Sequence, residues 1–321
     1  MRWLRERMKE DRGATAVLVG ILMVPLVGFV AIALDVGAIY VERGQLQNGA
    51  DAAALAIAQE CAEDGVCNAP NALAESFTDA NANDGAANNL VPAFPNDHTV
   101  IVSASTRTAA GENAIRHPFA ALIGVSSSTV GASATAEWGA PSGGTVVLPL
   151  ALSFCEFTPA LDGKLVLIKY DTKLKCEGPK GLIPGGFGWL DRPAGDCAAF
   201  VDPSTGEALI EQGNSYPGAC DALMMNLKGT TVLVPIFDSI IDKTGGDKSY
   251  GIYGFAAFTV TGWKFSGGTK LPQVSIDSAA PKCTGTCRGI QGYFDRWVSL
   301  ADADAELGGP DLGAYFVRLI D

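Results

Sequence analysis

The stretch that decides the fold is Ala14 to Leu34, ATAVLVGILMVPLVGFVAIAL, which carries no charged residue over 21 positions. A helix of this length extends about 31 Å, which is enough to cross the hydrocarbon core of a bilayer. The segment therefore predicts a transmembrane helix over residues 14–34, with the membrane lipid bilayer as its partner.

Charged residues on either side of this segment predict its orientation. The stub of residues 1–13 holds five basic residues against three acidic ones, whereas Asp35 and Glu42 follow the segment with Arg43 as the one nearby counterweight. Basic flanks tend to stay in the cytoplasm. The expected protein is single-pass in a bacterial cell membrane, with a cytoplasmic N-terminus and an extracytoplasmic C-terminal domain.

A cleaved signal peptide is the alternative to a retained anchor, because Ala31-Ile32-Ala33 resembles a peptidase site. The apolar region of a signal peptide spans roughly 7–15 residues, and this one is longer. The helical pattern also continues beyond Leu34. These two observations favour the retained anchor.

Apolar residues recur at helical spacing after the membrane segment. This pattern predicts one continuous helix of about 45 residues, half in the bilayer and half outside it. The off-stripe positions Gln45 and Gln47 are expected to face water. Within the membrane, Ala16 and Gly20 form a small-xxx-small face for a neighbouring helix. The residues expected to pack outside the membrane are Leu46, Ala50, Ala53 and Ile57, on a stripe that also contains Val36 and Ile39.

Two glycines interrupt the second half of this helix, at Gly44 and Gly49. Each costs a helix about 1 kcal/mol relative to Ala. Two explanations remain open: the helix bends at these positions, or a neighbouring helix approaches closely.

The rest of the chain predicts a small α+β unit completing residues 35–140, and then a mainly β domain over residues 145–321. Helix patterns cover residues 72–83 and 117–125, and strand patterns cover 98–108 and 127–138. Ala140 to Gly144, APSGG, is expected to be a linker. Strand-rich segments dominate afterwards, at residues 145–154, 164–170, 231–237, 250–267 and 314–320.

All the cysteines lie after the membrane segment, in an even number, which is typical of disulfides in exported proteins. Metal binding is the alternative, because Cys283-x3-Cys287 is loosely ligand-like, but no second close Cys pair or ligand-spaced His pair completes a set of four. Sequential pairing is the expected connectivity. The residues concerned are Cys61, Cys67, Cys155, Cys176, Cys197, Cys220, Cys283 and Cys287.

Composition and motifs argue against several function classes. The net charge of −12 disfavours nucleic acid as a partner. The two histidines, His98 and His117, are expected to be surface or turn residues and do not complete a catalytic set. The sequence contains no G-x-S-x-G elbow, phosphate loop or EF-hand loop. No catalytic residue, cofactor or metal site is therefore predicted, and the protein is not expected to be an enzyme.

The first 60 residues resemble the TadE/TadG-like family of Flp (Tad) pilus assembly. The matching pieces are Asp11-Arg12-Gly13-Ala14, Asp35-Val36-Gly37 with Tyr40 and Arg43, and Leu46 to Ala58, LQNGADAAALAIA. Pilin-like relatives are cut after a Gly and carry Glu five residues later. Here Leu18 stands at that place, which is similar to the TadG-like branch with an uncleaved anchor.

The resemblance implies a non-catalytic, membrane-anchored component of Flp/Tad pilus assembly, with other pilin-like or Tad secretion proteins as partners. A different function class stays open beside it. The helix could tether an envelope module that binds a glycan or a peptide, with aromatic side chains of the second domain as its contact surface.

Overall fold

The computed structural model describes residues 2–157, 163–170, 172–211, 216–265, 282–300 and 306–320; for residues 2–14, 122, 123 and 300 it describes the backbone. The chain forms two compact units. The first unit comprises Met1–Ile57, Asn68–Ala136 and Leu319–Asp321, and the second unit comprises Ala58–Cys67 and Glu137–Arg318. The fold class is α+β, as predicted: a long apolar N-terminal helix, then a mostly β part with four disulfides.

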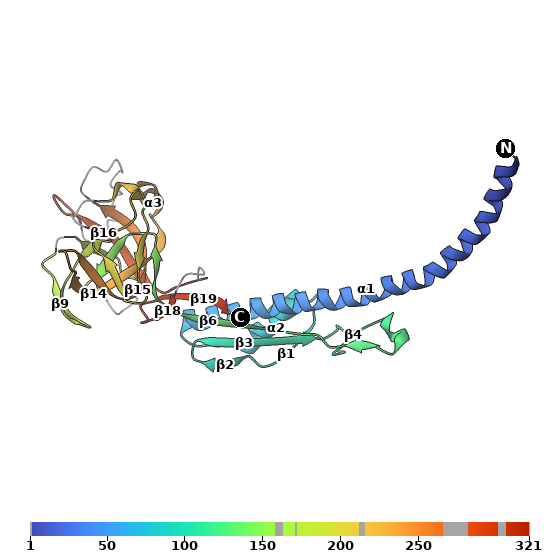
Figure 1. Cartoon of the computed structure of the whole chain (residues 1–321). Helices are drawn as coiled ribbons and strands as arrows, with labels where there is room; N and C mark the ends of the chain where they lie inside the picture. The colour runs from blue at the N-terminus through green and yellow to red at the C-terminus, as the bar shows by residue number, and fades with distance from the viewer. Residues whose placement is uncertain are drawn as a thin grey trace. The chain divides into compact units, whose positions relative to one another are not determined.

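The N-terminal helix α1 (Arg2–Asp64) is continuous over 63 residues and passes through Pro25 without a break (Figure 1). It is longer than the expected 45 residues because the basic stub is also helical and because the helix continues to Asp64. The prediction of one helix that contains both the membrane segment and the packed extension is confirmed.

In the first unit, α1 and α2 (Pro70–Asn81) lie beside a sheet (Figure 1). Pro at the first turn of α2 suits a helix start, since its missing N–H has no partner there anyway. The sheet has the order β1 (Ala87–Asn89), β3 (Thr99–Thr106), β6 (Gly131–Val146), and β2 (Ala93–Asn96) pairs with β3. Val100, Val102 and Ala104 of β3 are buried on one face, as their alternation predicted.

A hairpin of β4 (Ile115–Arg116) and β5 (Ser127–Ser128) also belongs to the first unit. The helix expected over residues 117–125 is wrong, because the segment forms one 3-10 turn, η1 (Ala120–Ile123). Gly124, at φ +95°, ends this turn in the left-handed conformation that stops helices. His117 is buried, with its Nε2 2.8 Å from the Ser128 hydroxyl, so its expected surface position is also wrong; His98 is exposed in a turn.

The second unit contains a seven-stranded sheet of order β11-β7-β14-β15-β16-β8, with β13 paired to β15. The long antiparallel pair β14 (Thr230–Asp242) and β15 (Lys248–Lys264) forms its centre. The other strands are β7 (Leu150–Ser153), β8 (Val166–Lys169), β11 (Phe187–Trp189), β13 (Glu207–Leu209) and β16 (Gly289–Asp295).

Shorter elements complete the second unit. Beyond residue 136, β6 pairs with β12 (Ala199–Val201) and β18 (Glu306–Gly309), while β17 (Trp297–Leu300) runs parallel to β19 (Ala314–Ile320). β9 (Lys175–Gly178) and β10 (Gly181–Pro184) form a hairpin. Besides residues 58–64 of α1, the described helices here are the 3-10 turn η2 (Gly218–Cys220) and α3 (Asp221–Asn226).

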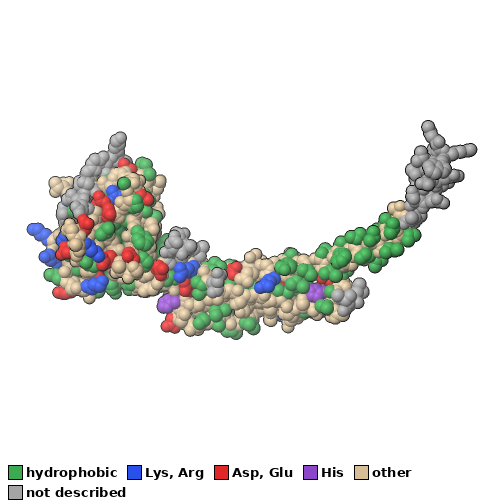
Figure 2. All heavy atoms as spheres, viewed as in Figure 1, with side chains coloured by type: hydrophobic (Ala, Val, Ile, Leu, Met, Phe, Trp, Pro, Cys, Tyr) green, Lys and Arg blue, Asp and Glu red, His purple; other side chains and the backbone are tan. Residues whose placement is uncertain are grey.

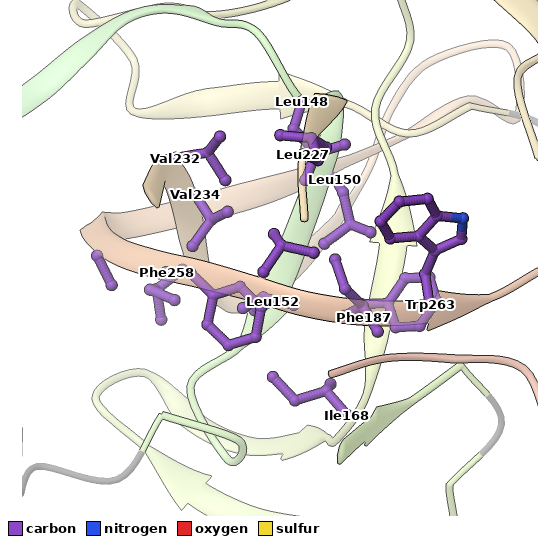
Figure 3. Close-up of a cluster of buried hydrophobic side chains, with 14 of the residues drawn as sticks. Leu148, Leu150, Leu152, Ile168, Phe187, Leu227, Val232, Val234, Phe258 and Trp263 are labelled. Carbon is purple, nitrogen blue, oxygen red and sulfur yellow. The ribbon is translucent and has the colours of Figure 1, made fainter. Parts of the chain in front are cut away.

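The core of the second unit is aliphatic and aromatic. Figure 3 shows part of it: Leu148, Leu150 and Leu152 belong to the same cluster as Phe187, Phe258 and Trp263. The aromatics that a binding module would need on its surface are largely inside this unit: Phe187, Trp189, Phe255, Phe258, Trp263 and Phe294 are buried. Their burial favours a packing role over a partner surface.

Ala140 to Gly144 is not a linker, because these residues lie inside β6 and pair with β18 and β12. Their small side chains serve close packing. A Cβ at Gly143 would lie 2.5 Å from Cβ of Pro203, and one at Gly309 would lie 2.1 Å from the Pro141 carbonyl oxygen. Glycine in a strand often marks such an approach of another backbone. The division expected at residues 140–145 stays a prediction.

The eight cysteines form four disulfides in sequence order: Cys61–Cys67, Cys155–Cys176, Cys197–Cys220 and Cys283–Cys287. In the chain-entropy account, such bridges stabilise a fold by restricting the unfolded chain, with an effect that grows slowly with loop length. The two central bridges close the longer loops, with separations of 21 and 23 residues. They therefore contribute more than the short Cys283–Cys287 loop.

The partly buried carboxyl of Glu156 predicts that the stability of the second unit depends on pH. Burial raises the pKa of its carboxyl, although the Gly186 N–H, which donates to Oε1 at 2.8 Å, lowers it. The neutral form therefore favours folding. Its stabilising contribution is complete below the ordinary pKa of about 4.5 and is lost as pH rises through the higher folded value.

We expect Glu156→Gln to match the wild-type unfolding free energy at pH 4 and to exceed it at pH 7, in denaturant titrations of the full chain in detergent. Exposed Glu177 supplies the matched control, since Glu177→Gln should follow the wild type at both pH values. A Glu156→Gln chain less stable than the wild type at pH 7 would contradict this account.

Candidate membrane anchor and helix-packing surface

The apolar half of α1 forms an uncovered surface. Among the described residues, α1 is the helix with the length and composition to cross a membrane, and its most apolar stretch is not buried within the structure. Figure 2 shows hydrophobic side chains along this half. Ala16 and Gly20 both lie on it, and a Cβ at Gly20 would find open space. Their pairing with another helix stays a prediction.

The second half of α1 is packed within the first unit. The side chains of Leu46, Ala50, Ala53 and Ile57 are at most 1% exposed. Leu46 belongs to a cluster with Ala87 of β1 and Ala104 of β3. One continuous helix therefore changes from an exposed apolar surface to a buried stripe.

The two interrupting glycines have different environments. A Cβ at Gly49 would lie 2.9 Å from Cα of Thr78 and 3.4 Å from Cβ of Asn81, both in α2. A Cβ at Gly44 would meet nothing within 4 Å. Close approach of a neighbouring helix therefore explains Gly49, and it does not explain Gly44.

Two glutamines that the periodicity assigned to solvent make specific contacts instead. Nε2 of Gln47 donates to the Asp51 carboxylate at 2.7 Å and to the Ser133 carbonyl at 3.2 Å, and Oε1 of Gln45 accepts from the backbone N–H of Asn83 at 2.9 Å. The Ser133 and Asn83 partners lie 86 and 38 residues away in the chain. No local pattern in the sequence could have indicated these long-range contacts.

Asp35 has a structural role that the sequence analysis missed. Its side chain is buried at 5% exposure, and its Oδ2 accepts the backbone N–H groups of Phe119 at 3.2 Å and Ala120 at 2.6 Å. Hydrogen bonds to an ionised carboxylate are among the stronger ones. Asp35 directly follows Leu34, so it joins the end of the apolar segment to the start of η1.

About two turns further along α1, Glu42 lies half-buried beside Thr106 and Asp84. Burial raises the pKa of its carboxyl, the Thr106 hydroxyl lowers it, and the negative charge of Asp84 raises it further. This acid lies among polar groups of the first unit.

The described part of the chain offers neither a free cysteine nor a cluster of metal-ligating side chains. All eight cysteines are in disulfides, so no thiolate is free. Among the described residues, no three His, Cys, Asp or Glu side chains are grouped to hold a metal ion.

In comparisons with known proteins, one family model matches part of this chain. Residues 13–60 match the family model described as "Putative Flp pilus-assembly TadE/G-like". The match begins one residue before the apolar segment and ends within the buried half of α1, so it covers both the exposed surface and the packed stripe. No curated protein and no solved structure matches the chain.

Proposed function

We propose that this protein is a non-catalytic, single-pass component of Flp/Tad-type pilus assembly or anchoring, which holds an exported, disulfide-bonded domain at the cell membrane. The observation that carries the proposal is the family match over residues 13–60, which coincides with the candidate membrane span and its packed extension. The first half of α1 is the anchor, and the second half builds the exported fold.

Charge supports an inward N-terminus. The stub before the apolar segment carries five basic residues, and Asp35 lies directly after the segment. Asp35 is also part of the first unit through its bonds to η1. The exported fold therefore begins at the membrane surface. The four disulfides are consistent with that side, because they persist in oxidising compartments.

Contact with other membrane helices of the pilus machinery is the proposed mode of action. Small residues at Ala16 and Gly20 would let the backbone of a partner helix approach closely. Both positions are uncovered in the structure.

Replacement of both residues by Ile in the native bacterium should therefore reduce the number of surface pili strongly, while the protein stays in the membrane fraction. Protease added to intact cells should still remove the exported part and spare the stub, since Ile is apolar and the anchor is retained.

Gly28→Ile is the matched control, because Gly28 lies about 80–120° around the helix from these two residues and is also uncovered. It should leave piliation unchanged. Normal piliation in the Ala16→Ile/Gly20→Ile double variant would contradict the proposed contact of these two residues with a partner helix. Loss of pili in both variants would mean that the whole surface of the span matters.

A further inference from the structure

The segment between β4 and β5 is an apolar loop on the surface of the first unit. Residues 117–125, HPFAALIGV, contain no Asp, Glu, Lys or Arg. Phe119 is 40% exposed and Val125 is 51% exposed. Arg116, at the base of the loop, forms an ion pair with Glu112. The loop therefore presents apolar side chains without a net charge beside them.

The position of this loop relative to the anchor is fixed by Asp35. The Asp35 carboxylate accepts hydrogen bonds from Phe119 and Ala120 and is buried beneath them. Asp35 is the first residue after the 14–34 segment, and a helix rises about 1.5 Å per residue. The loop therefore lies at the level where α1 leaves the hydrocarbon core. Ala31, one turn earlier in α1, is already partly covered.

We propose that residues 117–125 form a second membrane contact, with Phe119 and Val125 inserted into the interface of the outer leaflet. The inference rests on the membrane span proposed above and adds a separate lipid-binding element to it. Apolar side chains at this level settle at the boundary between headgroups and acyl chains, about 5–10 Å deep. Because Glu112 pairs with Arg116, the contact is apolar and does not depend on anionic lipid.

The consequence for the exported part is a defined orientation. A single membrane-spanning helix can tilt and rotate in the bilayer and carries the first unit with it, whereas a second contact from a different part of the chain restricts that motion. Asp35 joins the two contacts, because it belongs to α1 and holds the loop. The membrane-spanning half of α1 would then present the same face to any partner helix in the membrane.

Site-directed fluorescence in vesicles tests this. The full chain is reconstituted into phosphatidylcholine vesicles with one added cysteine, Val24→Cys, Phe119→Cys or Phe94→Cys, each labelled with a polarity-sensitive NBD fluorophore. The added thiol is the one that reacts, since the native cysteines are all paired. Phe94 is the matched control because it is 41% exposed and lies in β2, at the other end of the first unit from β4 (Figure 1).

Spin-labelled lipids in the bilayer should quench the label at residues 24 and 119 at least threefold more than the label at residue 94. Val125→Cys should behave as Phe119→Cys does, which guards against a local effect of one substitution. Raising the salt concentration should leave the quenching at residue 119 unchanged.

The possible failures are distinguishable. If the label at residue 24 is not quenched, the anchor itself is wrong. If residue 24 is quenched while residues 119 and 125 match residue 94, the anchor stands and the loop contact is overturned. Loss of quenching at residue 119 in high salt would also overturn it, because the contact would then be electrostatic.

Discussion

Ala53→Glu should lower the free energy of unfolding of the first unit by about 3–5 kcal/mol, the cost of leaving an uncompensated charge inside a protein. Ala53 is fully buried in the packed half of α1, between Ala50 and Ile57, which are also fully buried. A carboxylate there either becomes protonated or forces the helix away from the sheet. Either outcome lowers the stability of the first unit, so the amides of β3 become exposed more often.

Amide hydrogen exchange of the full chain in detergent micelles measures this effect locally. A loss of about 3 kcal/mol corresponds to exchange about 100-fold faster in β3. Asn48→Glu is the control, because Asn48 is exposed on the same helix and the variant adds the same charge. Gln47→Glu would be a poor control, since Gln47 donates to Asp51 and Ser133. Equal protection of β3 in both variants would mean that this stripe does not support the first unit.

Features governed by local periodicity could be predicted from the sequence. The steps between Leu46, Ala50, Ala53 and Ile57 are those of one helix face, and burial of that face needs no knowledge of the partner. The alternation of Val100, Val102 and Ala104 gave the buried face of β3 in the same way. The expected extracytoplasmic location and the even number of cysteines were enough to predict disulfides, because the oxidation of cysteines depends more on the compartment than on the fold.

Features that depend on distant segments could not be predicted. In the sequence, Asp35 indicated only a negative charge after the apolar segment. In the structure, its hydrogen-bond partners are backbone N–H groups 84 and 85 residues away. APSGG had the composition of a linker, but Gly143 and Pro141 serve close contacts with Pro203 and Gly309 inside the second unit. Composition cannot distinguish a flexible glycine from one required by a neighbouring backbone, because both lack a side chain for different reasons.

The family match has a physical interpretation in these terms. Residues 13–60 contain the exposed apolar segment, the Asp35 bridge to the loop, the close approach at Gly49 and the buried stripe. Each of these features constrains the sequence of α1 for a different reason. The strands of the first unit need only keep a buried face toward the helix, so many sequences would satisfy them.

Gly49→Leu should destabilise the packing of α2 on α1 by about 2 kcal/mol, as expected for overpacking of a tight contact. A Cβ at this position would already lie 2.9 Å from Cα of Thr78, which is backbone and can only yield if α2 moves as a whole. The larger Leu side chain has no space in this contact. The gain of about 1 kcal/mol in helix propensity from replacing Gly is too small to compensate.

Gly44→Leu supplies the matched control, because it adds the same side chain to the same helix at a site with open space. The propensity gain is then uncompensated, so this variant should be slightly more stable than the wild type. Exchange of the α2 amides in the full chain should become roughly 25-fold faster in Gly49→Leu and should not accelerate in Gly44→Leu. Because helix propensity cancels between the two, their difference reports the α1–α2 contact alone. If the two variants exchanged equally, Gly49 would be tolerated as a bend in α1, and the close approach would not be the reason for glycine there.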